Sequence, residues 1–177
     1  MKIYYMRSLL FLCISLLLTS CGFRPQGEKP LAPALHRLYL QAPDPYGQLV
    51  RSLEPYLKMS HVRLVPRDEA TASLIIIQDD TAQELLSVSG TQQTRQYKLI
   101  VNVTFEILDA SGVIVLPPQT LSESRTITIQ SNQVLGSTNE ANLFYQQMRR
   151  TLAYSIINRI ASQEVTNLIN HRSHPSS

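Results

Sequence analysis

Alternation of apolar and polar residues is clearest from Tyr97 to Leu108, which reads "YKLIVNVTFEIL". The odd-numbered positions of this run are apolar, and the even-numbered positions are mostly polar, with Ile100 and Leu108 as exceptions. Successive side chains of a β-strand point to opposite faces of the sheet. The run therefore predicts a long strand in a sheet with one covered face and one polar face.

Further alternating or apolar runs predict strands at residues 36–42, 61–66, 73–89, 113–116 and 120–130. We expect an interruption of 73–89 at Asp79 and Asp80, because adjacent carboxylates on a strand would point to opposite faces and a turn or solvated break suits them better. A turn is expected at residues 109–112. Pro117–Pro118 indicate a bend or a sheet edge, because proline cannot donate a ladder hydrogen bond.

One amphipathic helix is predicted after the first strand. Asp44 is a suitable N-cap, and Pro45 is favoured at a first helical position. The apolar residues that follow at helical spacing are Leu49, Val50, Leu53 and Leu57. Pro55 lacks an N–H group and crowds the preceding turn, so we expect it to kink this helix or to end it early.

A longer helix is predicted towards the C-terminus. Ser137 and Glu140 have the spacing of a capping box. No proline or glycine occurs from Asn139 to Ser173, so the helix is expected to run to about Ile169. Its apolar face comprises Tyr145, Met148, Leu152, Ile156 and Ile160.

The order of these elements predicts an α+β fold. We expect a two-layer sandwich with two helices packed on one face of a four-stranded, mainly antiparallel sheet. Residues 35–170 are interpreted as a single domain, and residues 171–177 as a flexible polar tail.

The N-terminus has the features of an export signal. The uncharged run at residues 8–20 follows Lys2 and Arg7, and it is shorter than the roughly 20 residues of a membrane-spanning helix. A spanning helix and a buried core helix are therefore less suitable interpretations than a cleaved signal peptide at residues 1–20.

The cysteine at the end of this run indicates lipidation. Leu18–Cys21 reads "LTSC" and resembles the bacterial lipobox, in which the chain is cut before a cysteine that carries diacylglycerol. Cys13 would leave with the signal, so Cys21 would have no partner for an internal disulfide. Residues 21–34 are interpreted as the lipidated N-terminus and a proline-rich tether. Gly22, in place of the aspartate that usually retains lipoproteins at the inner membrane, predicts anchoring at the outer membrane.

The net charge of the chain bears on whether its partner is a nucleic acid. Cleavage before Cys21 removes Lys2 and Arg7, so the 16 basic residues become 14 against 13 acidic residues, and the net charge falls to about +1. A nearly neutral chain argues against nonspecific binding to nucleic acid.

Candidate catalytic chemistry is sparse. The four histidines, His36, His61, His171 and His174, stand beside no nucleophile motif. No P-loop, nucleophile elbow or dinucleotide-binding fingerprint occurs. We therefore expect a binding or structural protein that is not an enzyme and that uses no cofactor or metal.

One loop is a candidate binding element. Residues 87–95, "SVSGTQQTR", are expected to form a polar hairpin tip between two long strands, with Arg95 and Lys98 as a pair of cations. Loops often carry function, but a solvated hairpin explains the same residues.

Three segments resemble the LptE family of lipopolysaccharide-assembly lipoproteins: Cys21–Arg24, the run "TRQYKLIVNVTFEILDASGVIVLP", and "SNQVLGSTNEANLFYQQMRR". The resemblance implies a plug inside a large outer-membrane β-barrel, which assists insertion of lipopolysaccharide at the cell surface and is held by a lipid at Cys21. It also implies contact with lipopolysaccharide through cations at the hairpin tip, where Arg95 and Lys98 lie near the family's basic position but not on it. Ser137 and Thr138 stand in the loop where the family would have a lysine.

Two other functions remain open. One is an accessory lipoprotein of another envelope lipid-transport complex, whose partner would not be a barrel. The other is an anchored hydrolase, which would require a buried cluster of titratable groups with shifted pKa values.

Overall fold

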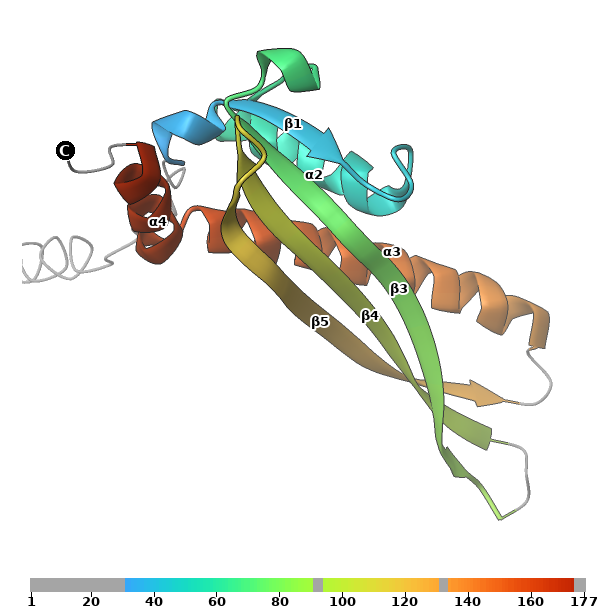
Figure 1. The fold of residues 1–177 in the computed structure, drawn as a ribbon. Helices are drawn as coiled ribbons and strands as arrows, with labels where there is room; N and C mark the ends of the chain where they lie inside the picture. The colour runs from blue at the N-terminus through green and yellow to red at the C-terminus, as the bar shows by residue number, and fades with distance from the viewer. Residues whose placement is uncertain (1–30, 91–93, 131–133, 174–177) are drawn as a thin grey trace, which may run out of the picture.

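The computed structural model describes residues 31–90, 94–130 and 134–173. In chain order the elements are η1 (Pro33–Leu35), β1 (Arg37–Gln41), α2 (Gln48–Met59), β2 (Arg63–Leu64), η2 (Arg67–Glu69), β3 (Ala72–Val88), β4 (Thr94–Asp109), β5 (Ile114–Gln130), α3 (Val134–Ile160) and α4 (Gln163–Ser173). Figure 1 shows α2 and α3 behind a long twisted sheet and α4 near η1 at one end. The predicted signal peptide and Cys21 lie outside the described residues.

The described strands form one sheet in the order β2-β1-β3-β4-β5. β1 is parallel to both β2 and β3, whereas β3, β4 and β5 are antiparallel neighbours. The α+β class is confirmed in outline. The expected four strands and two helices are wrong in detail, because the described chain has a mixed five-stranded sheet and three α-helices.

β3 is one continuous strand of 17 residues, so the expected break at Asp79 and Asp80 is wrong. Both residues pair with β4, opposite Val103 and Asn102. Irregularity is confined to two bulges, at Ile76/Gln78 and Leu85/Ser87. A bulge adds a residue to one strand and increases the local twist without ending the pairing.

β5 continues through Pro117–Pro118, where the sequence indicates a bend or a sheet edge. Pro117 and Pro118 lie inside β5, which is an edge strand, and β4 shows register shifts opposite them, between Phe105 and Leu108. The edge interpretation is therefore confirmed. An edge strand tolerates proline because one side of its backbone needs no ladder partner.

α2 begins later and ends later than expected. Asp44 is not its N-cap: its Oδ1 accepts the amide of Tyr46, its carbonyl accepts the amide of Gly47, and Gly47 precedes the helix. Pro55 does not end α2, which continues to Met59. Pro55 is exposed, so the carbonyl of Arg51, one turn earlier, can be solvated without an amide partner.

The long C-terminal helix is two helices. α3 begins at Val134, so Ser137 lies inside it and not at its N-cap, although the side chain of Ser137 lies outside the described residues. α3 ends at Ile160, and Ser162 caps α4 by accepting the amide of Val165 at 3.4 Å. A serine at an N-cap satisfies an amide that has no partner within the helix.

The core lies between the sheet and the two longest helices. Leu99, Val101, Val103 and Phe105 of β4 are fully buried, as the alternation predicts. Met148, Leu152, Ile156 and Ile160 of α3 are 0–3% exposed, so its predicted apolar face is confirmed. Leu31 and Ala32, which the sequence assigns to the tether, also belong to this core.

Candidate functional site

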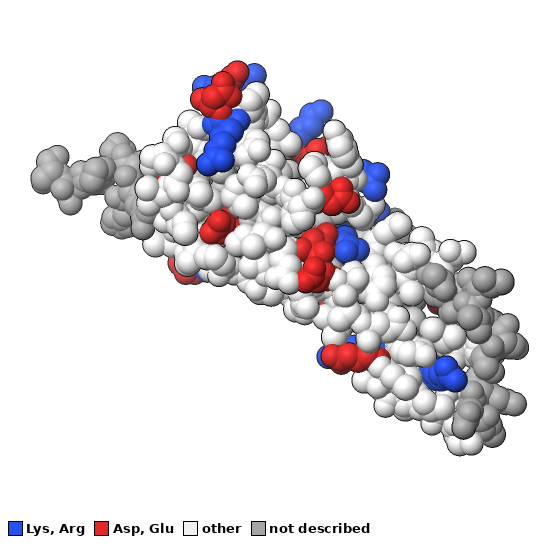
Figure 2. All heavy atoms as spheres, turned by 45° about the vertical axis from the view of Figure 1, so that its right-hand side comes forward, with Lys and Arg blue, Asp and Glu red and all other residues white. Residues whose placement is uncertain are grey.

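No helix of the described chain covers the second face of β3, β4 and β5, here called the open face (Figure 1). The ladder registers place an array of hydroxyl and amide side chains on it: Gln78, Gln96, Asn102, Thr104, Thr120, Ser122, Ser124, Thr126 and Thr128. Charged residues interrupt the array at Asp80, Glu84, Lys98 and Glu106. In Figure 2, uncharged atoms dominate the side of the molecule shown, with charges in small separate groups.

Hydrogen bonds along the open face join neighbouring strands. The Thr104 and Thr120 hydroxyls are 2.8 Å apart, and Ser87 Oγ donates to Gln96 Oε1 at 3.1 Å. Each hydroxyl also has an unused lone pair or proton that can face outward. The open face is therefore a preformed polar surface that can form hydrogen bonds with a polar partner.

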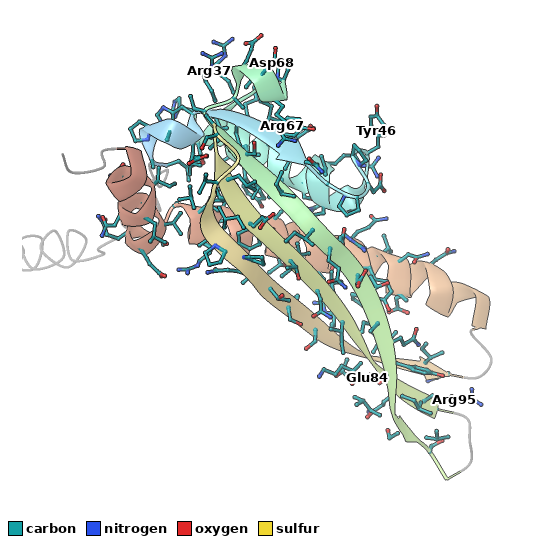
Figure 3. All side chains as sticks on the ribbon, in the orientation of Figure 1. Arg37, Tyr46, Arg67, Asp68, Glu84 and Arg95 are labelled. Carbon is teal, nitrogen blue, oxygen red and sulfur yellow. The ribbon has the colours of Figure 1, made fainter. Side chains whose placement is uncertain are left out.

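Arg95 and Lys98 do not form the pair of cations that was expected at the hairpin tip. β4 is regular from Thr94 to Phe105 in its pairing with β5, so Arg95 and Lys98, three residues apart, point to opposite faces. Arg95 lies between Val88 and Ile129, on the side of α3. Lys98 is on the open face, directly opposite Glu84 of β3. Figure 3 labels Glu84 and Arg95 at the hairpin end of the sheet.

The hairpin closes just beyond Arg95. Ser89 donates its amide to the carbonyl of Thr94 at 2.8 Å, and Ser89 Oγ accepts the amide of Thr94 at 3.1 Å. Residues 91–93 of the expected tip lie outside the described residues. The second expected loop is absent at Ser137 and Thr138, which belong to α3.

Sequence reasoning missed an ion pair between the two layers. The Nε of Arg149 in α3 lies 2.9 Å from both Oδ1 and Oδ2 of Asp79 in β3. Strand alternation places Asp79 on the helix side, and Arg149 follows Met148 at the margin of the apolar face. The continuous strand was the missing information, because a break at Asp79 would have removed this register.

Other polar contacts hold α3 to the strands and to α4. Arg125 of β5 donates to Gln147 Oε1 at 2.7 Å and stacks 4.6 Å from the ring centre of Phe144. The phenol of Tyr145 donates to the carbonyl of Ala82, and burial raises the pKa of Tyr145. Arg159 binds both carboxylate oxygens of Glu164, and these hydrogen bonds lower the pKa of Glu164. These contacts fix the relation between the layers, so the open face is rigidly supported.

Within the described residues, no three His, Cys, Asp or Glu side chains are grouped to hold a metal ion. None of the helices there has the length and apolar character required to cross a bilayer.

Comparison with known families decides the class of the protein. The model of the lipopolysaccharide-assembly family LptE matches residues 35–160, which includes β1 to β5 and α2 to α3. The chain belongs to the LptE family.

Relatives of the LptE family cover most of the chain. The LPS-assembly lipoprotein LptE of Pectobacterium atrosepticum is 27% identical over 176 residues, 94% of each chain. That of Yersinia enterocolitica is 28% identical over 155 residues, 86% of this chain and 74% of the relative. The predicted family, its role in lipopolysaccharide assembly and the expectation of a non-enzymatic lipoprotein are thereby confirmed.

Solved structures show the same fold. The rare lipoprotein B of Shewanella oneidensis is 26% identical, with a TM-score of 0.63 over 73% of this chain and 96% of its own. A lipoprotein B of Nitrosomonas europaea has a TM-score of 0.67 at 21% identity, over 85% of this chain and 97% of its own. The five-stranded mixed sheet with its helices on one face is thus a fold found in other bacterial lipoproteins.

Proposed function

We propose that this LptE-family lipoprotein is anchored in the outer membrane and plugs a large β-barrel, where it assists insertion of lipopolysaccharide at the cell surface. The open face is the observation that carries this proposal. The interior of a wide membrane barrel is polar. A broad array of Ser, Thr, Asn and Gln on three paired strands can hydrogen-bond to such a wall with few charges to desolvate.

The layers behind the open face support the same function. α2 and α3 cover the other face, and one ion pair and several hydrogen bonds hold α3 to β3 and β5. A plug must keep its shape while it contacts the barrel. Rigid partners also lose little conformational entropy on association.

Photo-crosslinking in cells tests the plug. A benzoylphenylalanine at Ser124, exposed on the open face of β5, is expected to capture one integral β-barrel protein, identified by mass spectrometry. The same group at Asp68, in the exposed η2 corner, measures capture that does not depend on the open face. Capture at Ser124 of envelope transport proteins that are not barrels would instead support the accessory-lipoprotein alternative.

Cys21 is expected to carry the lipid anchor. The mass of the protein extracted from membranes should exceed that of the chain from Cys21 onward by a diacylglycerol and an acyl chain. Two or three acyl chains hold a protein stably, whereas one holds it reversibly. Cys21→Ser should therefore release the protein from the membrane fraction, and a free thiol at Cys21 in the wild-type protein would contradict the anchor.

Arg95 and Lys98 are expected to contribute to lipopolysaccharide binding through the phosphates of lipid A. Arginine binds phosphate oxygens in a bidentate manner, whereas lysine acts as a point charge. Because Glu84 faces Lys98 and offsets its charge, Arg95→Ser should weaken binding more than Lys98→Ser. The double variant should bind least and depend least on salt.

Binding of lipopolysaccharide to the purified protein, followed across a salt series, provides the measurement. Lys58→Ser, in the last turn of α2, removes an exposed cation away from the tip and is the matched control. Thermal stability should change little in any of these variants, because exposed charges contribute about 0–1 kcal/mol. Equal binding by the double variant and the control would contradict a role for the two cations.

A further inference from the structure

A groove at the β2–β1 edge of the sheet, the edge away from β5, has the features of a site for an extended peptide. It has a volume of about 290 Å³ and lies between β1, the start of α2 and the segment after β2. Its lining is mainly apolar: Leu40, Ala42, Pro45, Val50, Leu64, Val65 and Pro66, together with Tyr39 and Glu54. Leu64 is 42% exposed on its rim.

The backbone beside this groove is unpaired within the described chain. β2 pairs only with Arg37 and Leu38 of β1, so residues 39–41 have β3 on one side and no strand on the other. The carbonyls of His36 and Leu38 accept amides from the β2 side, at 2.8 and 3.0 Å. By alternation, Leu40 is the next residue whose amide and carbonyl point to that edge. An exposed strand edge is a template for an added strand.

The groove also has a charge preference. Glu54 is the one charged residue of its lining, and it has no ion-pair partner among the residues that the structure describes. A cationic side chain placed beside the apolar hollow would complement this carboxylate.

An exposed tyrosine stands next to the groove. Tyr46 is 85% exposed and projects outward in Figure 3. Its backbone amide is bound by the Asp44 carboxylate, and Gly47 leaves room for that carboxylate, since a Cβ at position 47 would lie 2.9 Å from Asp44 Oδ2. Tyrosine supplies a large contact area at a low cost in conformational entropy and is enriched in interfaces.

We propose that an extended segment of the partner barrel protein adds to the free edge of β1. An apolar side chain of this segment occupies the hollow between Leu40, Val50 and Leu64, and a neighbouring lysine or arginine pairs with Glu54. Strand addition of this kind combines main-chain hydrogen bonds with pockets for alternate side chains. The inference rests on the proposed function for the identity of the partner, and the groove itself is a contact separate from the open face.

Crosslinking at two positions distinguishes the two proposals. Benzoylphenylalanine at Leu64 in the full-length protein is expected to capture the same barrel protein as Ser124, through one stretch that contains a lysine or arginine within two residues of the crosslink. If Ser124 captures the barrel while Leu64 captures nothing, a lipid or a second copy of this chain, the groove proposal is overturned and the plug stands. If neither captures a barrel, the plug fails as well.

Charge reversal tests the contact of Glu54. Glu54→Lys should lower the crosslinking yield at Leu64 about tenfold and leave the yield at Ser124 within about twofold, because the charge pair is local. Lys58→Glu, which reverses an exposed charge on the same helix outside the groove lining, is the control. A yield at Leu64 that falls equally in both variants would overturn the pairing of Glu54 with a cation.

Hydrogen exchange tests the added strand. In the purified complex the amide of Leu40 should exchange more slowly than in the free protein. Gln41, which already pairs with β3 opposite Ile75, should change little. Unchanged exchange at Leu40 in a complex that does form would overturn strand addition.

Discussion

Val103→Arg is expected to prevent folding, whereas Asn102→Arg, one residue earlier on β4, should leave the domain folded. Val103 is fully buried on the side of α3, and Asn102 lies half-buried on the open face. An unpaired charge in the core costs several kcal/mol, which is comparable with the total stability of about 5–15 kcal/mol of a typical domain. Circular dichroism during thermal unfolding distinguishes the two variants.

Phe105→Ala tests the same buried face with a smaller expected loss of stability. Phe105 is also fully buried, and its truncation should reduce the free energy of unfolding by about 3–5 kcal/mol. The variant should retain enough structure for a denaturant titration. Similar destabilisation by Val103→Arg and Asn102→Arg would show that both faces of the sheet are covered, and would contradict the open face.

Arg149→Ala is expected to destabilise the protein by about 2 kcal/mol, because it leaves the Asp79 carboxylate in a partly buried place without its partner. A fully buried pair loses about 3–5 kcal/mol when one partner is removed. The expected cost is smaller here because the two side chains remain 18% and 19% exposed. Asp79→Ala should have a similar effect.

A double-mutant cycle separates the ion pair from other losses. The variant that lacks both Asp79 and Arg149 should be less destabilised than the sum of the single variants, by about 0.5–3 kcal/mol in urea unfolding. Arg37→Ala is the control, because its pair with Glu69 has side chains that are 50% and 57% exposed. That control should cost less than about 1 kcal/mol. Strict additivity of the Asp79 and Arg149 variants would contradict a bond between the layers.

Local periodicity was sufficient for the central part of the fold. The alternation from Tyr97 to Leu108 identified both the strand and its buried face, and the apolar face from Met148 to Ile160 is the face that packs on the sheet. Burial of these side chains is dictated by spacing along a single element, so no information from distant residues was needed.

Boundaries within the elements were less well predicted. The sequence around Asp79–Asp80 indicates a break because Arg149, which pairs with Asp79, is 70 residues away in the chain. The end of α3 at Ile160 was missed because Ser162 is a helix-capping residue but not a helix-breaking one.

Side-chain periodicity along the chain was enough to identify the apolar face of the strand at residues 97–108 and the helix face that packs on the sheet, and three sequence segments were enough to indicate the family. The sequence also contained the separation of Arg95 and Lys98, since residues three apart on a regular strand point to opposite faces. Only the tertiary structure decided that β1 and β2 pair in parallel, that β2 covers just two residues of β1, and that Glu54 lines the resulting groove. The physical reason is that side-chain alternation reports burial along one element, whereas strand order, register and the gap at a sheet edge depend on contacts between residues far apart in the chain.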